Sequence, residues 1–283
     1  MPYRNWLLAA FFIMCSLAPA EAAGRPRGDE RNVFGSYYTQ DYLAFKKQIV
    51  AEFGGAGAGK FGEFVKYRRK DEDKGMDQKA LALTFDACGG RHSGYNAQLI
   101  EYLRREHIPA TLFVTGVWIE KNKETFAALA KDPLFEIENH GLMHRLCSTE
   151  GKTKYGVRAT RDLGDVVDEI ELGARKITEI TGRRPVFFRS ATAYTDELSL
   201  KVAKRLGMEV VSYDILSGDA MRSSARTMAR NILNGARHGA VVIMHFNHPE
   251  WAELQALEEA VPELRKRGYN FMKLEDLSPK PGK

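Results

Sequence analysis

The chain has few cysteines, little excess charge of either sign and few long apolar runs. Only 3 cysteines occur in 283 residues, which excludes a small fold stapled by many disulfides. The hydrophobic fraction of 44% and the charged fraction of 28% are ordinary for a folded protein, so a disordered or collagen-like chain is excluded as well. The net charge of +5 permits attraction to anionic surfaces, and no nucleic-acid partner is expected from it.

One apolar run, residues 6–17, lies near the N-terminus. It follows an arginine, is too short to span a bilayer and precedes two Ala-x-Ala patterns that end at Ala20 and Ala22. This order is typical of a signal peptide, residues 1–22, although an uncleaved anchor is an alternative. A lipoprotein is less favoured because bulky Met14 precedes the cysteine. Since no second run of membrane length occurs, we expect an exported protein, periplasmic or extracellular, without stable membrane insertion after cleavage.

Residues 23–78 form an extension before the regular part of the chain. We expect a helix over 42–53, followed by the glycine-rich stretch 54–59. The spacing of its glycines and Lys60 is similar to that of a phosphate-binding loop, but Phe61 stands where a hydroxyl would hold magnesium. We therefore interpret the glycine-rich stretch as a flexible linker.

From residue 79 onward, short β-prone apolar runs alternate with amphipathic stretches of helix length. This alternation predicts an α/β fold with a mainly parallel sheet, either closed into a barrel or open. Glycines follow several expected helices, as is common at helix C-termini. We expect a single catalytic domain over 79–277 and a short tail, 278–283. The expected strands are 81–85, 110–114, 134–138, 186–188, 209–213, 240–244 and 270–274, and the expected helices are 97–105, 123–130, 162–181, 195–206, 225–236 and 253–267.

Polar residues follow five of these strands. Because the carboxyl ends of parallel strands meet at one edge, we expect the polar side chains to gather there. The His-x3-His spacing also lets one helical turn present two imidazoles to a single metal ion. Any one of these residues could be structural, but their repeated position indicates a functional site. They are Asp86 after the first strand, His140 and His144 after the third, Arg189 after the fourth, Asp214 and Asp219 after the fifth, and His245 after the sixth.

The order and spacing of these residues resemble the polysaccharide deacetylase family, carbohydrate esterases that share a NodB homology domain. Residues 84–89, Thr-Phe-Asp-Ala-Cys-Gly, are similar to the family's Thr-Phe-Asp-Asp-Gly segment. The resemblance covers residues 79–277 and implies a distorted (β/α)7 barrel. It also implies Asp86 as catalytic base, His140 and His144 as metal ligands, Arg189 as the residue that holds the base, and His245 as catalytic acid.

Three features depart from the family's pattern. Ala87 stands where the family has a metal-binding Asp, so a third protein ligand is missing or comes from elsewhere. The Arg segment has Ala191 and Ala193 in place of the family's Pro and Gly. The family's Asp-x-x-Asp-Trp segment has no aligned tryptophan, so either Asp214 or Asp219 could support the acid histidine. The candidates for the third ligand are Asp86, Cys88, Glu138, His92 and water.

The implied chemistry is metal-assisted hydrolysis of an amide. A divalent metal on imidazoles can polarise the acetyl oxygen and acidify water, and zinc suits such ligands best, with Co, Ni or Mn as alternatives. Asp86 would then take a proton as general base, and His245 would protonate the leaving amine. Arg189 would favour the ionised form of Asp86, and Asp214 or Asp219 would favour charged His245.

The two cysteines outside the leader follow the first and third polar clusters. In an oxidising compartment, a disulfide between Cys88 and Cys147 is one hypothesis. The competing hypothesis makes Cys88 a thiolate metal ligand. A nucleophilic Cys88 paired with His92 is a weaker third possibility.

The expected substrate is an N-acetylated hexosamine polymer of the cell envelope. Peptidoglycan is the first choice because its peptides are anionic, followed by chitooligosaccharides, exopolysaccharides and O-acetyl esters. A different possibility, prompted by Ala87, is a catalytically impaired glycan-binding protein on the same barrel. Aromatic residues that could stack on sugars, or belong to the core or a lid, are Tyr194, Tyr213, Phe246 and Trp251.

Overall fold

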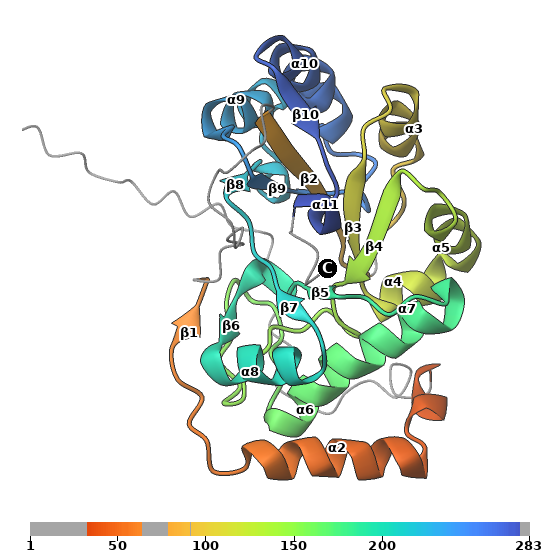
Figure 1. Cartoon of the computed structure of the whole chain (residues 1–283), viewed down its shortest axis with the longest axis vertical. Helices are drawn as coiled ribbons and strands as arrows, with labels where there is room; N and C mark the ends of the chain where they lie inside the picture. Colours follow the sequence, from red (N-terminus) through yellow and green to blue (C-terminus); the bar gives the residue numbers. More distant parts are fainter. Residues whose placement is uncertain (1–32, 64–78, 91, 278–283) are drawn as a thin grey trace, which may run out of the picture. The chain divides into compact units, whose positions relative to one another are not determined.

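The computed structural model describes residues 33–63, 79–90 and 92–277 (Figure 1). The chain divides into two compact units, Met1–Tyr42 and Leu43–Lys283. In the first unit, the described residues form the short 3-10 helix η1 (Gly35–Tyr37) and the start of α2 (Gln40–Phe53). The predicted signal peptide and C-terminal tail lie outside the described residues. No helix within the described ranges is long and apolar enough to cross a membrane.

A curled sheet of eight strands forms the centre of the second unit, and all of its pairings are parallel (Figure 1). Seven strands follow one another in the order β7 (Glu209–Val210), β5 (Phe187–Phe188), β4 (Phe135–Asn139), β3 (Ala110–Val114), β2 (Lys79–Ala87), β9 (Ala240–His245) and β8 (Ile215–Leu216). The eighth strand, β10 (Tyr269–Phe271), pairs with the first residues of β2. Only residues 211–214 separate β7 from β8, yet these two strands are not paired, so the barrel is incomplete. The prediction of a distorted (β/α)7 barrel is confirmed, with β8 as an additional short strand.

Strand β2 is the longest strand of the sheet and is almost fully buried. Every residue of Lys79–Ala87 after the first is buried, as expected for a central parallel strand covered on both faces. Apolar side chains such as Leu83 and Leu112 on the strands form one core with Trp118 and Leu257 on the helices. The helices are α3 (Ala97–Arg105), α4 (Gly116–Lys121), α5 (Lys123–Ala130), α6 (Leu163–Val167), α7 (Gly173–Thr181), α8 (Glu197–Arg205), α9 (Ala225–Gly235), α10 (Glu253–Lys266) and α11 (Leu274–Leu277).

Two predicted helices differ from the structure in a way that bears on the site. The long helix expected over 162–181 contains a π-helical segment, η2 (Asp168–Leu172), between α6 and α7. Such segments are frequent at functional sites. The helix expected over 195–206 begins two residues later, because Thr195–Asp196 forms the short strand β6. Asp196 then caps α8 by accepting a hydrogen bond from the Ser199 amide at 2.8 Å.

The part of the extension within the second unit makes specific contacts with the barrel, contrary to a flexible linker. Ile49 of α2 is buried in a second apolar cluster with Val166 and Val202. Strand β1 (Phe61–Gly62) pairs antiparallel with β6. At Gly59, whose φ is +72°, a Cβ atom would lie 2.4 Å from Glu197 Oε2. The glycine there allows a close approach to α8, and the resemblance to a phosphate-binding loop has no structural counterpart.

Candidate active site

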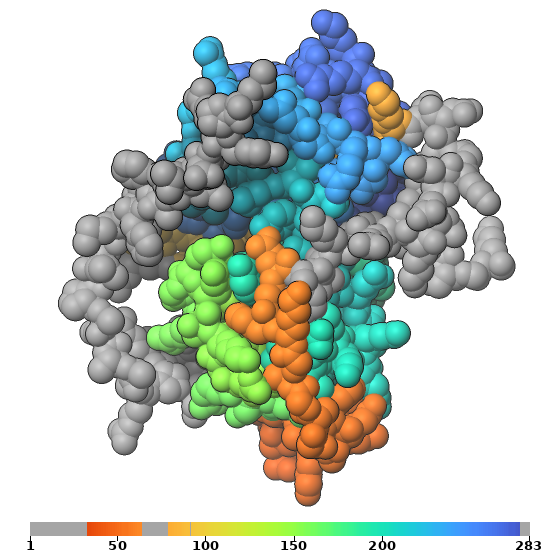
Figure 2. Space-filling view, turned by 90° about the vertical axis from the view of Figure 1, so that its left-hand side faces the viewer, coloured from red at the N-terminus to blue at the C-terminus, as the bar shows by residue number. Residues whose placement is uncertain are grey.

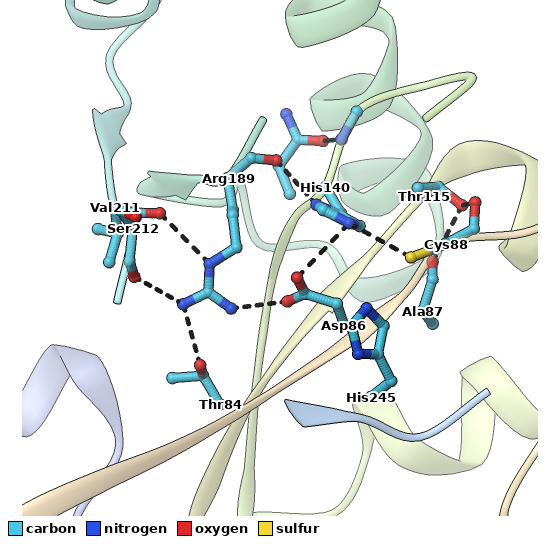
Figure 3. Close-up of polar contacts among 12 residues, drawn as sticks. Thr84, Asp86, Ala87, Cys88, Thr115, His140, Arg189, Val211, Ser212 and His245 are labelled. Atoms are coloured by element: carbon cyan, nitrogen blue, oxygen red, sulfur yellow. Dashed lines mark hydrogen bonds and ion pairs between the residues drawn. The ribbon is translucent and has the colours of Figure 1, made fainter. Parts of the chain in front are cut away.

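Four of the predicted site residues meet where the strands end. Asp86 and His245 lie at the ends of β2 and β9, while His140 and Arg189 directly follow β4 and β5. Figure 3 shows Asp86, His140 and His245 pointing toward one another, with Cys88 beside them. The rule that parallel strands present their carboxyl ends to one edge therefore places these side chains in a common site.

Asp86 is fixed by a buried ion pair with Arg189. The Arg189 Nη1 atom donates to Asp86 Oδ1 at 2.6 Å, and neither side chain is more than 4% exposed. The rest of the guanidinium is also used: Nη2 donates to Thr84 Oγ1 at 2.9 Å and to the Ser212 carbonyl at 3.0 Å. The guanidinium also lies 4.1 Å from the centroid of the Phe113 ring. Arg189 thus has a single well-supported position, and Asp86 Oδ2 is left to face His140 at 3.6 Å.

Three side chains of types that can bind a metal ion converge beside Asp86. Ligand atoms of Cys88, His140 and His144 all lie within 4.8 Å of one another. His140 Nδ1 lies 2.8 Å from the Arg189 carbonyl, which can only accept, so Nδ1 carries the proton and Nε2 is free to bind a metal. That Nε2 atom is 3.7 Å from Cys88 Sγ. One sulfur and two imidazole nitrogens form a donor set that suits zinc, and the residues present fit a metal site.

Cys88 is a candidate for the third ligand that Ala87 cannot supply. Ala87 is fully buried in the hydrophobic core, whereas Cys88, one residue later, faces the two histidines. Burial opposes ionisation of the thiol, but the nearby charges of His144 and His245 hold the pKa of Cys88 well below its usual value. A thiolate is the form of cysteine that binds metals. Among the open candidates for a third ligand, Cys88 therefore both faces the two histidines and favours the negatively charged thiolate form.

The loop that carries His144 is held by the π-helical segment η2. The Glu169 carboxylate accepts hydrogen bonds from the amides of Met143 and Arg145, at 3.1 Å and 2.9 Å. Burial raises the pKa of Glu169, although these amides act in the opposite direction. Next to the loop, Gly141 adopts φ +93°, and a Cβ atom there would lie 2.2 Å from Glu169. The helical spacing of residues 162–181 did not predict that Glu169 would support the loop of His144.

His245 is paired with Asp219. The His245 Nδ1 atom lies 3.0 Å from Asp219 Oδ2, and the other Asp219 oxygen accepts from Ser217 and from the Ala220 amide. Burial lowers the pKa of His245, but the negative charges of Asp219 and Cys88 outweigh it and raise this pKa well above its usual value. Asp214 instead binds Arg237 and the Val241 amide. Of the two carboxylates left open by the sequence, Asp219 is the one in contact with His245.

The remaining candidate residues have other surroundings. Glu138 is fully buried and binds Arg183 and the amides of Val186 and Phe187, so it supports the start of β5 rather than the metal site. His92 is exposed and is not among the three converging ligands.

The hypothesised disulfide is absent, because both cysteines are free. Cys88 faces the histidines, whereas Cys147 is buried in the second apolar cluster, beside residues such as Val166 and Phe188. Burial raises the pKa of the Cys147 thiol well above its usual value. Cys147 therefore behaves as a core residue.

Sequence reasoning missed Glu253, a buried carboxyl near His245 and Asp219. Glu253 is 0% exposed, and neither of its oxygens has a hydrogen-bond partner within the described residues. Burial, with a smaller contribution from Asp219, raises the pKa of Glu253 to about 8. The residue begins α10 in an ordinary amphipathic pattern, so no motif marks it.

We predict that Glu253→Gln stabilises the protein in a pH-dependent way. Because the pKa of Glu253 is raised in the folded state, the unfolded chain ionises first, and wild-type stability falls as pH rises from about 4.5 to 8. The variant should exceed the wild type by on the order of 3 kcal/mol at pH 8 and by much less at pH 5. Urea unfolding at both pH values measures this difference. An equal difference at the two pH values would contradict the assignment of a neutral Glu253.

Comparison with known proteins identifies the family. The family described as "Polysaccharide deacetylase" matches residues 73–211. A peptidoglycan-N-acetylglucosamine deacetylase from Bacillus cereus is 26% identical over 204 residues, which cover 71% of this chain and 89% of that protein. A peptidoglycan-N-acetylmuramic acid deacetylase from Bacillus subtilis is also 26% identical, over 71% of this chain and 72% of that protein.

Solved structures share the fold. The structure of a CE4 family pseudoenzyme from Bacillus anthracis superimposes with a TM-score of 0.60 at 21% identity, over 71% of this chain and 66% of that one. A mutant of this pseudoenzyme is described as having restored enzymatic activity. At this identity the likeness concerns the fold alone. The family match, the two Bacillus relatives and the converging site residues agree with this shared fold. The chain belongs to the polysaccharide deacetylase family and is a hydrolase of the deacetylase type.

Proposed function

We propose that this chain is an exported, metal-dependent enzyme that removes N-acetyl groups from hexosamine residues of a cell-envelope polysaccharide. The observation that carries the proposal is the convergence of Asp86, His245 and the Cys88/His140/His144 donor set. Peptidoglycan is the first choice of substrate, supported by the two relatives that act on it and by the net charge of +5. Chitooligosaccharides and exopolysaccharides come next. We further propose that residues 1–22 direct export to the periplasm or the exterior and that residues 23–78 precede the catalytic domain.

Cys88, His140 and His144 would hold the metal, with zinc favoured by the sulfur and imidazole donors. When bound, such an ion supplies a Lewis acid that polarises an acyl oxygen and acidifies water. Asp86 Oδ2, 3.6 Å from His140 Nε2, lies beside the same donors. That position allows Asp86 to act as an additional ligand or as a hydrogen-bond acceptor at this site.

Asp86 and His245 would each carry out one of the two proton transfers in amide hydrolysis. Asp86 Oδ2 would accept the proton of the attacking water, since Arg189 binds Oδ1 and holds the carboxylate in place. His245 would donate the proton from Nε2 to the departing sugar nitrogen, while Asp219 holds Nδ1 and favours the charged ring. Without that proton an amine is a poor leaving group. Asp219 and Arg189 are thus positioning residues for the acid and the base.

A second candidate is a glycan-binding protein without turnover. Ala87, at the position of a family metal ligand, favours it, as does the likeness to a structure described as a pseudoenzyme. The placement of Cys88 argues against it, because a binding protein has no need of a donor set beside an acid and a base.

Acetate release separates the two candidates. We expect the zinc-loaded protein to release acetate from peptidoglycan, with a chitooligosaccharide and a generic acetyl ester as comparison substrates. Metal removal should abolish release, and zinc should restore it. No release from any of these substrates, with zinc, cobalt, nickel or manganese, would overturn the enzymatic proposal in favour of binding.

A further inference from the structure

A group of aromatic side chains lies beside the Arg189 end of the site. Four rings from separate segments make up this aromatic platform: Phe61 of β1, Tyr155 of the long loop after β4, Tyr194 before β6, and Tyr213 between β7 and β8. The Tyr194 ring centroid lies 5.7 Å from that of Phe61 and 5.8 Å from that of Tyr155. Burial raises the pKa of Tyr213, with smaller contributions from a hydrogen bond to Glu63 and from the nearby Tyr155 and Tyr194 hydroxyls.

One ring of the platform is exposed, the other three are partly exposed, and a charged side chain lies against two of them. Tyr155 is 71% exposed. The Lys154 ammonium lies over two of the rings, 4.9 Å from the Tyr155 centroid and 5.4 Å from the Tyr194 centroid. Tyr155 also has a left-handed backbone with φ +53°, a strained conformation for a bulky residue that is often kept at functional sites.

Chain connections place the platform next to the catalytic residues. Tyr213 directly follows Ser212, whose carbonyl accepts a hydrogen bond from Arg189 Nη2 at 3.0 Å. Tyr194 follows the turn in which the Ala193 amide donates to the Ser190 carbonyl, one residue beyond Arg189. The loop of Tyr155, like these two segments, leaves a strand at its carboxyl end, so all three segments lie on the side of the barrel where the site opens.

The N-terminal segment completes the platform. Phe61 is held in place by the pairing of β1 with β6, and the Glu197 and Leu198 amides donate to the Lys60 and Ala58 carbonyls. Figure 2 shows the orange residues of this segment between the green residues of the loop after β4 and the teal residues around β6. The other aromatic candidates are placed differently, since Phe246 is buried and Trp251 stacks on His248 at 3.9 Å.

We propose that the aromatic platform binds a sugar ring of the polymer, next to the residue that is deacetylated. Pyranose rings present apolar C–H faces that stack on aromatic rings, while their hydroxyl and amide groups can bind the charged groups of Lys154 and Glu63, which contact the platform. The inference rests on the proposed function for the identity of the polymer. It assigns to the N-terminal segment a part in substrate binding through Phe61.

Calorimetry with a pentamer of N-acetylglucosamine tests the platform without turnover, using metal-stripped protein. The wild type should bind the pentamer, and Tyr155→Ala should weaken binding roughly 3- to 10-fold. Tyr155→Phe retains the ring and should bind like the wild type. Val186→Ala, an exposed apolar position before β5 and so at the opposite end of the strands, serves as the surface control.

The outcomes separate this inference from the proposed function. Wild-type affinity in Tyr155→Ala, or no pentamer binding by the wild type, would overturn the platform even if acetate is released. Conversely, Tyr155-dependent binding without acetate release by any metal form would support the platform and overturn the enzymatic proposal.

Discussion

Replacing Cys88 with alanine is expected to abolish tight zinc binding. Only His140 and His144 would remain of the three converging donors, and two imidazoles alone do not make a closed zinc site. Metal analysis after dialysis should find zinc in the wild type and almost none in the variant. In cobalt-substituted protein, the thiolate-to-cobalt charge-transfer band should be present in the wild type and missing from Cys88→Ala.

Cys88→Asp is the matched control for this prediction. It returns a carboxylate, the ligand type of the family, to the edge of the site, and should retain zinc while losing the charge-transfer band. Ala87→Asp should not rescue Cys88→Ala, since Ala87 is fully buried in the core and a carboxylate there would be desolvated. Full zinc content and an intact cobalt spectrum in Cys88→Ala would show that the sulfur is not a ligand.

His245→Gln is expected to lower kcat for N-acetyl substrates by roughly 10²- to 10⁴-fold, the usual contribution of a general acid. The reason is that an amine cannot leave without a proton. A p-nitrophenyl acetate ester has a leaving group that needs none, so its hydrolysis should fall far less. Steady-state kinetics on both substrates measure the contrast. Equal losses on amide and ester would assign His245 a role other than proton donation.

The pH profile tests the partner of this acid. Asp219 raises the pKa of His245, and the acid must be protonated to act, so His245 should set the alkaline limb of kcat. Asp219→Asn removes that charge and should move the alkaline limb to lower pH. Asp214→Asn is the control, because Asp214 binds Arg237 and should leave the limb in place. An unchanged profile in Asp219→Asn would contradict the pairing.

Much of the fold could be predicted because the spacing of apolar residues along the chain reflects which positions are buried. The run that becomes β2 is continuous because the strand is covered on both faces, and most helix boundaries agree to within one or two residues. Short-range patterns did not reveal β8, a strand of two residues, or the pairing of β1 with β6, which joins segments far apart in the chain. Both depend on tertiary contacts that local propensity does not encode.

The sequence predicted where the candidate site lies better than it predicted which of its residues contact one another. Asp86, His140 and His245 lie at or just after strand ends, and strand ends converge in any parallel sheet. The choice between Asp214 and Asp219 depended on how a loop folds, and the pairing of Cys88 with the histidines depended on which way the chain turns after β2. Glu169 and Glu253 are invisible to motif analysis because their importance comes from burial and from backbone groups, not from spacing.

Titration of metal-free protein with zinc tests the central claim most directly, with bound zinc and acetate release from peptidoglycan measured on the same samples. We predict no release without zinc, a rise in release that follows bound zinc, and neither binding nor release in the His140→Ala/His144→Ala double variant. Full acetate release by the metal-free protein or by the double variant would contradict a metal-dependent deacetylase built on these residues.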